Sequence, residues 1–285
     1  MIAWPASLVD ALARRRCVIV IGSGVSANSQ TADGRRPRTW GAFLDTLYAS
    51  LNKRVNHISA ALSQYRYLEA SSYLKNELGA EWSGALKAEF GDPVYRSASI
   101  HEHIFNLDVR IVASMNFDKI YDTYAITSSE GTVSVKSYDN AELRSAASGV
   151  GRYVIKLHGT IDTVPTLIFT LEDYSKARIK HAGFYEILVA LLHTHTFLFI
   201  GCGLNDPDMQ LVFEDHFNKF GEAPHFMTLP SPFSEKQISL IRDTRGINVL
   251  KYSSKNFHND LTVSLGELVK LVSVKRDEIV ASRDW

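Results

Sequence analysis

The chain has 285 residues and balances 31 Lys and Arg against 31 Asp and Glu. This length suffices for one sizeable α/β core or two small domains. Zero formal net charge gives no bulk signal for nucleic acid or an anionic membrane. Direct nucleic-acid binding is therefore not expected, although a basic face can be hidden in such a balance. Cys17 and Cys202 are too few for a disulfide framework or a four-cysteine zinc site, which favours a reducing cytoplasm.

No stretch of the sequence has the pattern of a targeting or membrane segment. The apolar run that follows the arginines at 14–16 is only about five residues long, short of a signal-peptide core. A later apolar stretch at 184–201 is interrupted by His193–Thr196, which predicts a helix followed by a strand. We therefore expect a soluble cytoplasmic protein without membrane contact.

The first third of the chain is predicted to be mostly helical. Leu8 and Leu12 mark a short helix before an apolar strand at 17–21, and the polar residues 34–40 form a loop. Apolar residues from Trp40 to Leu51 then recur at i, i+3, i+4, i+7 and i+11, the pattern of an amphipathic helix. Helical patterning continues to about Phe90, and no strand is expected between 29 and 107. We interpret residues 31–104 as a helical insert.

Strands and helices alternate in the rest of the chain. Strands are predicted at 110–114, 132–137, 152–159, 166–170, 196–203, 225–230 and 247–252. Helices are predicted from Phe117, from Thr170 to near Leu192, from Asp206 or Asp208 to 220, over 234–243, and finally to about Val274. This alternation predicts an α/β fold, a Rossmann-like doubly wound parallel sheet formed by 1–30 and 105–285 and covered on both faces.

Polar loops follow several of the predicted strands. They are GSGVS at 22–26, SMNFD at 114–118, LHGT at 157–160 and GCGLNDPD at 201–208. In a doubly wound sheet, ligands bind beyond the carboxyl ends of the strands. We therefore expect these loops to bring their residues to one rim of the sheet.

The glycine turn allows two interpretations. Gly22-Ser23-Gly24 can be a tight strand-to-helix turn without a ligand, or its backbone N–H groups can bind a diphosphate with help from the Ser26 hydroxyl. No acidic residue ends a second strand about twenty residues later, which disfavours a nicotinamide dehydrogenase. The absence of a following Gly-Lys-Ser/Thr excludes a Walker loop.

The other polar residues are also ambiguous when taken singly. Asn116 and Asp118 are good helix caps as well as possible ligand contacts. His158 can be a satisfied core histidine or a proton acceptor. Cys202 lacks a visible base partner and is interpreted as a small residue that allows a ligand to approach closely. Their delivery to one rim beside the glycine turn favours a functional site.

The set and order of these motifs resemble the sirtuin-like NAD-binding domain. Gly22–Ser26 is similar to that family's Gly-Ala-Gly-x-Ser loop, and Met115–Asp118 to its Gln-Asn-x-Asp segment. His158–Gly159 matches its His-Gly pair, and Gly201–Gly203 resembles its Gly-Thr/Ser-Ser turn. The resemblance covers most of the chain.

The sequence lacks several motifs of the deacetylating members of this family, which limits the resemblance to other members. The two Cys-x-x-Cys pairs of their structural zinc are absent, and Met115 stands where they have glutamine. Their Asp-Phe-Arg segment is also absent, with Arg35, Arg36 and Arg38 as the nearby arginines. The chain looks more like the sirtuin-like proteins that hydrolyse NAD in bacterial antiphage defence. Its length resembles the stand-alone partner of a HerA-type hexameric ATPase, which implies a homo-oligomer and such a partner.

The resemblance implies an NAD glycohydrolase that releases nicotinamide and ADP-ribose, with NAD as substrate and no zinc. Asn116 and His158 would be catalytic. The residues expected to contact NAD are Gly22, Ser23, Gly24, Val25, Ser26, Asp118, Gly201, Cys202, Gly203 and Asn205. Two alternatives stay open: a catalytically silent module that binds NAD or ADP-ribose and assembles with a partner, and an NAD-dependent protein deacylase that lacks the zinc.

Overall fold

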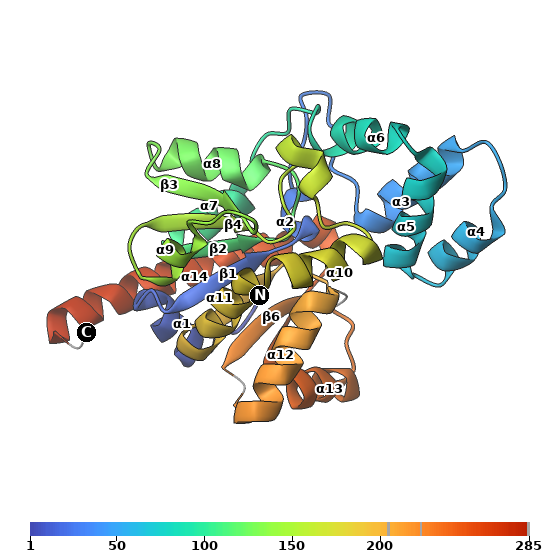
Figure 1. Cartoon of the computed structure of the whole chain (residues 1–285). Coiled ribbons are helices and arrows are strands. Elements are labelled where there is room, and N and C mark those ends of the chain that lie inside the picture. Colours follow the sequence, from blue (N-terminus) through green and yellow to red (C-terminus); the bar gives the residue numbers. More distant parts are fainter. Residues whose placement is uncertain (204–205, 223, 284–285) are drawn as a thin grey trace.

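The computed structural model of the protein describes residues 1–203, 206–222 and 224–283. Its centre is a seven-stranded sheet in the order β3-β4-β2-β1-β5-β6-β7, with every neighbouring pair parallel (Figure 1). The strands are β1 (Cys17–Ile21), β2 (Ile111–Ser114), β3 (Val133–Ser137), β4 (Arg152–Lys156), β5 (Thr196–Ile200), β6 (His225–Pro230) and β7 (Ile247–Tyr252). The predicted doubly wound parallel α/β sheet is confirmed.

The central strand β1 is buried on both faces, as its continuous apolar sequence predicts. Its residues alternate between two apolar layers: Cys17, Ile19 and Ile21 belong to one, and Val18 and Val20 to the other. The first layer is closed by α1 (Ala6–Ala13), α7 (Ser99–Asn106), α8 (Ile120–Ser128) and α14 (Lys255–Ser282). The second layer is closed by α9 (Leu143–Ala147), α10 (Leu171–Lys180), α11 (Ala182–Thr194), α12 (Pro207–Phe220) and α13 (Glu235–Arg245).

The helices of the insert form a third apolar cluster together with residues of the segment 161–169. They are α3 (Trp40–Ser50), α4 (Asn56–Ser63), α5 (Tyr67–Leu78) and α6 (Glu81–Phe90), and they lie together beside the sheet domain (Figure 1). Residues 29–107, all of them described, contain no strand, as predicted; Gln30 and Arg96 form an isolated bridge. Because Ile100 and Ile104 of α7 pack in the sheet layer with α14, we propose that the insert ends before α7.

Several predicted elements differ in the structure. Residues 166–170 do not form a strand: a 3₁₀ helix at Ile161–Thr166 leads into a buried extended segment, so the apolar run reflects burial alone. The single helix predicted from Thr170 to Leu192 is divided at His181, whose φ of −119° and ψ of 37° end α10 and precede α11. The Thr170 cap itself is confirmed, in a capping box with Asp173.

Two helix limits also differ from the prediction. The helix expected from Phe117 begins at Ile120, because the Asp118 side chain accepts the Ile120 N–H at 3.0 Å and holds residues 118–120 in a turn before the helix. The final helix extends beyond Val274 to Ser282, and its side chain at Ile279 is still buried against the sheet layer. Within the described residues, none of the helices has both the length and the apolar character that crossing a bilayer requires.

Candidate functional site

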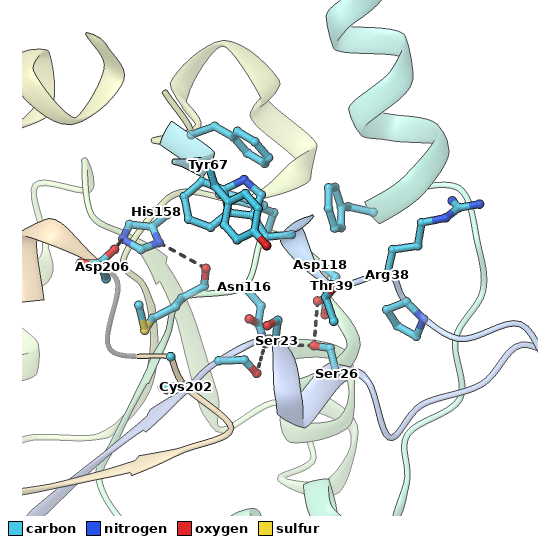
Figure 2. Close-up of a pocket in the computed structure, with 18 of the residues that line it drawn as sticks. Ser23, Ser26, Arg38, Thr39, Tyr67, Asn116, Asp118, His158, Cys202 and Asp206 are labelled. Atoms are coloured by element: carbon cyan, nitrogen blue, oxygen red, sulfur yellow. Dashed lines mark hydrogen bonds and ion pairs between the residues drawn. The ribbon is translucent and has the colours of Figure 1, made fainter. Parts of the chain in front are cut away.

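A cavity of about 320 Å³ lies between the carboxyl edge of the sheet and the helical insert (Figure 2). The sheet side contributes the loops that follow β1, β2, β4 and β5, which carry Ser23, Asn116, His158 and Cys202. The insert side contributes aromatic side chains and the loop that precedes α3. The four loops predicted to converge therefore do so, and they share one cavity.

The glycines of the first loop are required by contact between two loops. A Cβ atom at Gly22 would lie 2.6 Å from the Gly201 carbonyl oxygen, and one at Gly24 would lie 2.9 Å from the Gly201 Cα. The Gly24 N–H donates to the Gly201 carbonyl at 2.9 Å, and the N–H groups of Gly22 and Val25 also donate to protein carbonyls. This packing accounts for the glycines without a ligand, and it leaves the turn few free N–H groups for a diphosphate.

Asn116 is the centre of a buried hydrogen-bond network. Its side-chain nitrogen donates to the Gly22 carbonyl and to the Ser26 hydroxyl, both at 2.9 Å. Ser26 in turn donates to Asp118 Oδ2 at 2.8 Å, while Asp118 Oδ1 accepts the Ile120 N–H. The single hydroxyl hydrogen of Ser26 is thus committed to Asp118 and not free for a phosphate. Both amide hydrogens of Asn116 are also used, which leaves its Oδ1, an acceptor, for a ligand.

A buried ion pair contacts this network through the backbone of Asp118. Lys156, at the end of β4, places its Nζ 2.8 Å from Asp122 Oδ2 and donates to the Asp118 carbonyl at 2.6 Å. Burial raises the pKa of Asp122, and the charge of Lys156 opposes that rise. Removal of one member of such a pair leaves a buried charge uncompensated. The pair therefore fixes the loop that carries Asn116 and Asp118.

His158 lies between two hydrogen-bond acceptors (Figure 2), and its Nε2 is also 3.4 Å from the Tyr174 hydroxyl oxygen. Its Nε2 lies 3.0 Å from Asp206 Oδ2, and its Nδ1 lies 3.3 Å from the Met115 carbonyl oxygen. Asp206 Oδ2 also accepts the Tyr174 hydroxyl at 2.6 Å, and Asp206 Oδ1 accepts the Met209 N–H at 2.8 Å, which caps α12. Both partners of His158 are acceptors, and only an imidazolium can donate from both ring nitrogens. The geometry favours an imidazolium–carboxylate pair.

The pKa shifts agree with this protonation state. Burial alone would lower the pKa of His158, but the charge of Asp206 and the hydrogen bond to it outweigh burial and raise it above 6.5. Burial alone would raise the pKa of Asp206, but His158 and the hydrogen bonds from Tyr174 and the Met209 N–H lower it below 3.8. His158 can accept a proton from a substrate only after it has released one, so its action as a base is favoured by higher pH.

Cys202 has the surroundings of an inert thiol. Its Sγ lies 3.4 Å from the carbonyl oxygens of Val20 and Ile200, and burial raises its pKa. Since the thiolate is the nucleophilic form, these contacts agree with its interpretation as a small residue that shapes the cavity.

An aromatic wall faces the polar loops across the cavity. It consists of Trp40, Tyr67, Phe90, Phe117 and Phe169. The rings of Phe117 and Phe169 are stacked at 5.0 Å, and Trp40 packs edge-on against Phe169 at 5.7 Å. Such a wall can take a flat or cationic ring by stacking. This wall was not predicted from the sequence, because the aromatic residues of the insert are indistinguishable by spacing from ordinary core residues, and Phe117 and Phe169 belong to other segments.

Arg38 is the arginine of the loop before α3 that lines the cavity. Its guanidinium pairs with the buried Glu89, which also binds Arg35 at 2.9 Å. In Figure 2 the Arg38 side chain points away from His158. Arg36 lies elsewhere, 5.6 Å from the Phe257 ring centroid. The sequence could not choose among these arginines because all three occupy one irregular loop.

The predicted site residues fall into two groups. Those that line the cavity are Gly22, Ser23, Ser26, Asn116, Asp118, His158, Cys202 and Gly203. Gly24, Val25 and Gly201 lie behind it, where Val25 is part of the core. Asn205 is outside the described residues. Tyr174 was missed, and Asp206 was predicted only as a helix cap; no local motif marks their contact with His158. Over the described ranges, no group of His, Cys, Asp or Glu side chains has the arrangement of a metal site.

The fold is that of a Rossmann-like α/β protein with a cavity at the carboxyl edge of its sheet. Residues 110–250 match the family described as SIR2-like domain. The sirtuin-like resemblance predicted from the motifs is thereby confirmed.

Curated relatives agree with this family. The chain is 28% identical over 149 residues to "NAD(+) hydrolase ThsA" of Enterococcus faecium, covering 51% of this chain and 30% of that protein. It is 24% identical over 206 residues to the protein of the same name from Acinetobacter baumannii, covering 72% of this chain and 40% of that protein. It is 24% identical over 253 residues to "Defense-associated sirtuin 2" of Bacillus subtilis, covering 84% of this chain and 23% of that protein. The chain thus spans well under half the length of each.

Proposed function

We propose that the protein is an NAD glycohydrolase that cleaves NAD to nicotinamide and ADP-ribose. One observation carries the proposal: the amide oxygen of Asn116, which accepts no hydrogen bond from the described residues, and the His158–Asp206 pair line one cavity that is closed by an aromatic wall. Two relatives of the chain are named NAD(+) hydrolases, which supports NAD as the substrate.

The chemistry needs little acid catalysis. Cleavage of a glycosidic bond passes through an oxocarbenium-like state, and the pyridinium of NAD leaves as neutral nicotinamide without a proton donor. Asn116 Oδ1 would accept a hydrogen bond from the attacking water or a ribose hydroxyl. His158, once deprotonated, would take the proton that the water releases. The aromatic wall would stack against the planar rings of the substrate.

The proposed role is the effector of an antiphage, abortive-infection system in the cytoplasm. It is supported by the defence-associated relative and by the resemblance of the motifs to sirtuin-like proteins of antiphage defence. That resemblance also carries the proposals of a homo-oligomer and of a HerA-type hexameric ATPase partner. Native mass measurement of the protein with and without the ATPase, followed by an NAD assay of each species, tests both assemblies.

The central experiment measures nicotinamide released from NAD by the purified chain, alone and with the ATPase partner. Asn116→Ala and His158→Ala should each lower the rate at least about tenfold to a hundredfold, the usual size of such contributions. Asn218→Ala on α12 and His193→Ala on α11 are matched controls at exposed positions and should retain full activity. Full activity in a folded Asn116→Ala/His158→Ala double variant would overturn the assignment.

A silent binding module is the second candidate, favoured by one observation: both ring nitrogens of His158 are engaged by protein acceptors. NAD binding by calorimetry without nicotinamide release, under conditions that include the partner, would establish that function. The same reactions with an acetylated peptide added would show O-acetyl-ADP-ribose if the protein were a deacylase.

A further inference from the structure

Basic residues stand at the start of the four central strands, at the edge of the sheet opposite the candidate site. Arg152 is the first residue of β4, and Arg110, Arg16 and His195 immediately precede β2, β1 and β5. These strands are neighbours in the order β4-β2-β1-β5, and neighbouring strands lie about 4.8 Å apart. The four residues therefore form one row across the sheet edge, which we call the arginine row.

Two hollows open beside the arginine row. One, of about 280 Å³, is lined by Arg15, Asp108, Arg110, Gly149 and Arg152, among others. The other, of about 850 Å³, shares Arg15, Arg110 and Gly149 with the first and extends to Arg16 and His195. The guanidinium groups therefore border space that a ligand can enter.

The positive charge around the row is poorly balanced by the protein. Asp108 is shared among three arginines: it pairs with Arg15, lies 3.7 Å from Arg152 and lies 3.5 Å from Arg276. Arg110 Nη2 and Arg152 Nε are buried and have no hydrogen-bond acceptor in the described part of the chain. A buried guanidinium N–H without an acceptor is unfavourable, and an incoming anion would supply the acceptor.

The loop before β4 packs closely against the Arg110 guanidinium. Gly149 and Gly151 have φ of +94° and +85°, and a Cβ atom at Gly149 would lie 3.0 Å from Arg110 Nη1. Any larger residue at 149 would crowd that group. His195 reports the same excess of charge, since its pKa is lowered first by burial and then by the charges of Arg110 and Arg16.

We propose that the arginine row binds the phosphate groups of a ligand. Planar guanidinium forks match phosphate oxygens in pairs, and the row presents several of them along one edge, where Asp108 is the only carboxylate among the described residues that line the two hollows. The site lies at the opposite end of the sheet from the cavity that contains His158, so the proposal does not depend on the NAD reaction. Phosphates of a free nucleotide and phosphates of a nucleic-acid backbone share this chemistry.

The first test is calorimetric binding of pyrophosphate to the full chain at two salt concentrations. Binding should weaken with salt, and Arg110→Gln and Arg16→Ala should each raise the Kd at least about tenfold, the equivalent of about 1.4 kcal/mol. Arg66→Ala, an exposed arginine of the insert that pairs with Glu69, is the matched control and should not change the Kd. Thermal unfolding of every variant in buffer alone checks that each one folds.

Two further ligands distinguish the sources of the phosphate. ADP that binds as tightly as a ten-residue deoxythymidine oligonucleotide would assign the row to a free nucleotide, whereas an oligonucleotide that binds at least tenfold more tightly would assign it to a nucleic-acid backbone. In both cases Arg110→Gln must weaken binding.

Three results would overturn the proposal. One is the absence of binding by all three phosphate ligands. Another is binding that Arg38→Ala weakens and Arg110→Gln does not, which would locate the phosphate in the cavity at the other end of the sheet. The third is binding of an oligoglutamate peptide to the arginine row when the phosphate ligands do not bind there. That result would assign the arginine row to an acidic protein partner.

Discussion

His158 and Asp206 form a buried ion pair across the carboxyl edge of the sheet, with His158 Nε2 3.0 Å from Asp206 Oδ2. The two residues come from loops after β4 and β5, which are separated in the sheet by β2 and β1. Because Asp206 also caps α12 through its other oxygen, the orientation of the imidazole is tied to the start of that helix.

Asp206→Asn should change the pH dependence of NAD hydrolysis as well as its rate. In the native protein the raised pKa of His158 places the rising limb of kcat/KM above pH 6.5, because the deprotonated ring is the proton acceptor. Loss of the carboxylate charge lowers that pKa, so the limb should move to lower pH while the maximal rate falls about tenfold or more. Asp215→Asn, at an exposed position of α12, should leave the profile unchanged. An unshifted limb in Asp206→Asn would contradict the role of the pair.

Trp40→Ala should affect substrate binding more than turnover. Trp40 lines the cavity from the insert and packs against Phe169, so its loss opens the aromatic wall without touching Asn116 or His158. We expect KM for NAD to rise several-fold more than kcat falls, and Trp40→Phe to retain most of the affinity. Steady-state kinetics with Tyr65→Ala as the exposed control measures this. An unchanged KM in Trp40→Ala would show that the wall does not contact the substrate.

Gly22→Ala should destabilise the fold even without ligand. The added Cβ atom would meet the backbone of Gly201 and Cys202 at 2.6 Å and 2.8 Å, so the two loops must move apart. We expect a loss of about 1–3 kcal/mol in the free energy of unfolding and a fall of at least about 3 °C in Tm. Gly84→Ala is the control: it lies in α6 with open space around it, and it should stabilise by about 0.5–1 kcal/mol. Equal melting of the two variants would refute the packing explanation.

Acid should destabilise the protein partly through His225. This side chain is buried, its Nδ1 accepts the Phe197 N–H at 3.1 Å, and burial with the nearby His216 lowers its pKa to about 3. Below pH 6.5 the unfolded chain binds a proton that the folded chain does not. Stability is therefore full above pH 6.5 and falls by up to about 1.4 kcal/mol per pH unit as pH decreases toward 3.

Urea unfolding at pH 7.5, 6.0, 5.0 and 4.0 measures this loss. His225→Asn keeps an acceptor for the Phe197 N–H but does not titrate, so its stability should fall less steeply than that of the native chain over the same range. His57→Asn, at an exposed position of the insert, should keep the native slope. If the free energy of unfolding fell equally steeply with decreasing pH in the native chain and in both variants, a group other than His225 would be responsible for the loss.

Much of the fold follows from local sequence. The five apolar residues at 17–21 predict a strand buried on both faces, and the structure has one with those limits. The strand predicted at 166–170 was wrong: the three consecutive apolar residues there, Leu167, Ile168 and Phe169, are buried but do not pair with a strand. Apolar character predicts burial reliably, whereas pairing depends on neighbours distant in sequence.

The candidate site was predictable only in part, for the same reason. The loops that carry Asn116 and His158 directly follow strands, so their convergence follows from the parallel topology. Tyr174 and Asp206 lie 32 positions apart and meet through a hydrogen bond that no local pattern encodes. The glycine turn at 22–24 was recognised in the sequence, but its contact with Gly201 could not be predicted because the two segments are distant along the chain.

The two sides of the cavity come from different stretches of the chain. The polar groups proposed for bond cleavage lie on loops of the sheet domain, whereas Trp40, Tyr67 and Phe90 lie on helices of the insert, whose apolar cluster also includes Phe169 and its neighbours from the segment after β4. Under the proposed function, these three aromatic residues and the reactive loops are encoded in distinct stretches of the gene. Exchange of residues 31–98 for the matching stretch of another SIR2-like protein should alter which substrates are accepted while the reactive loops keep their shape.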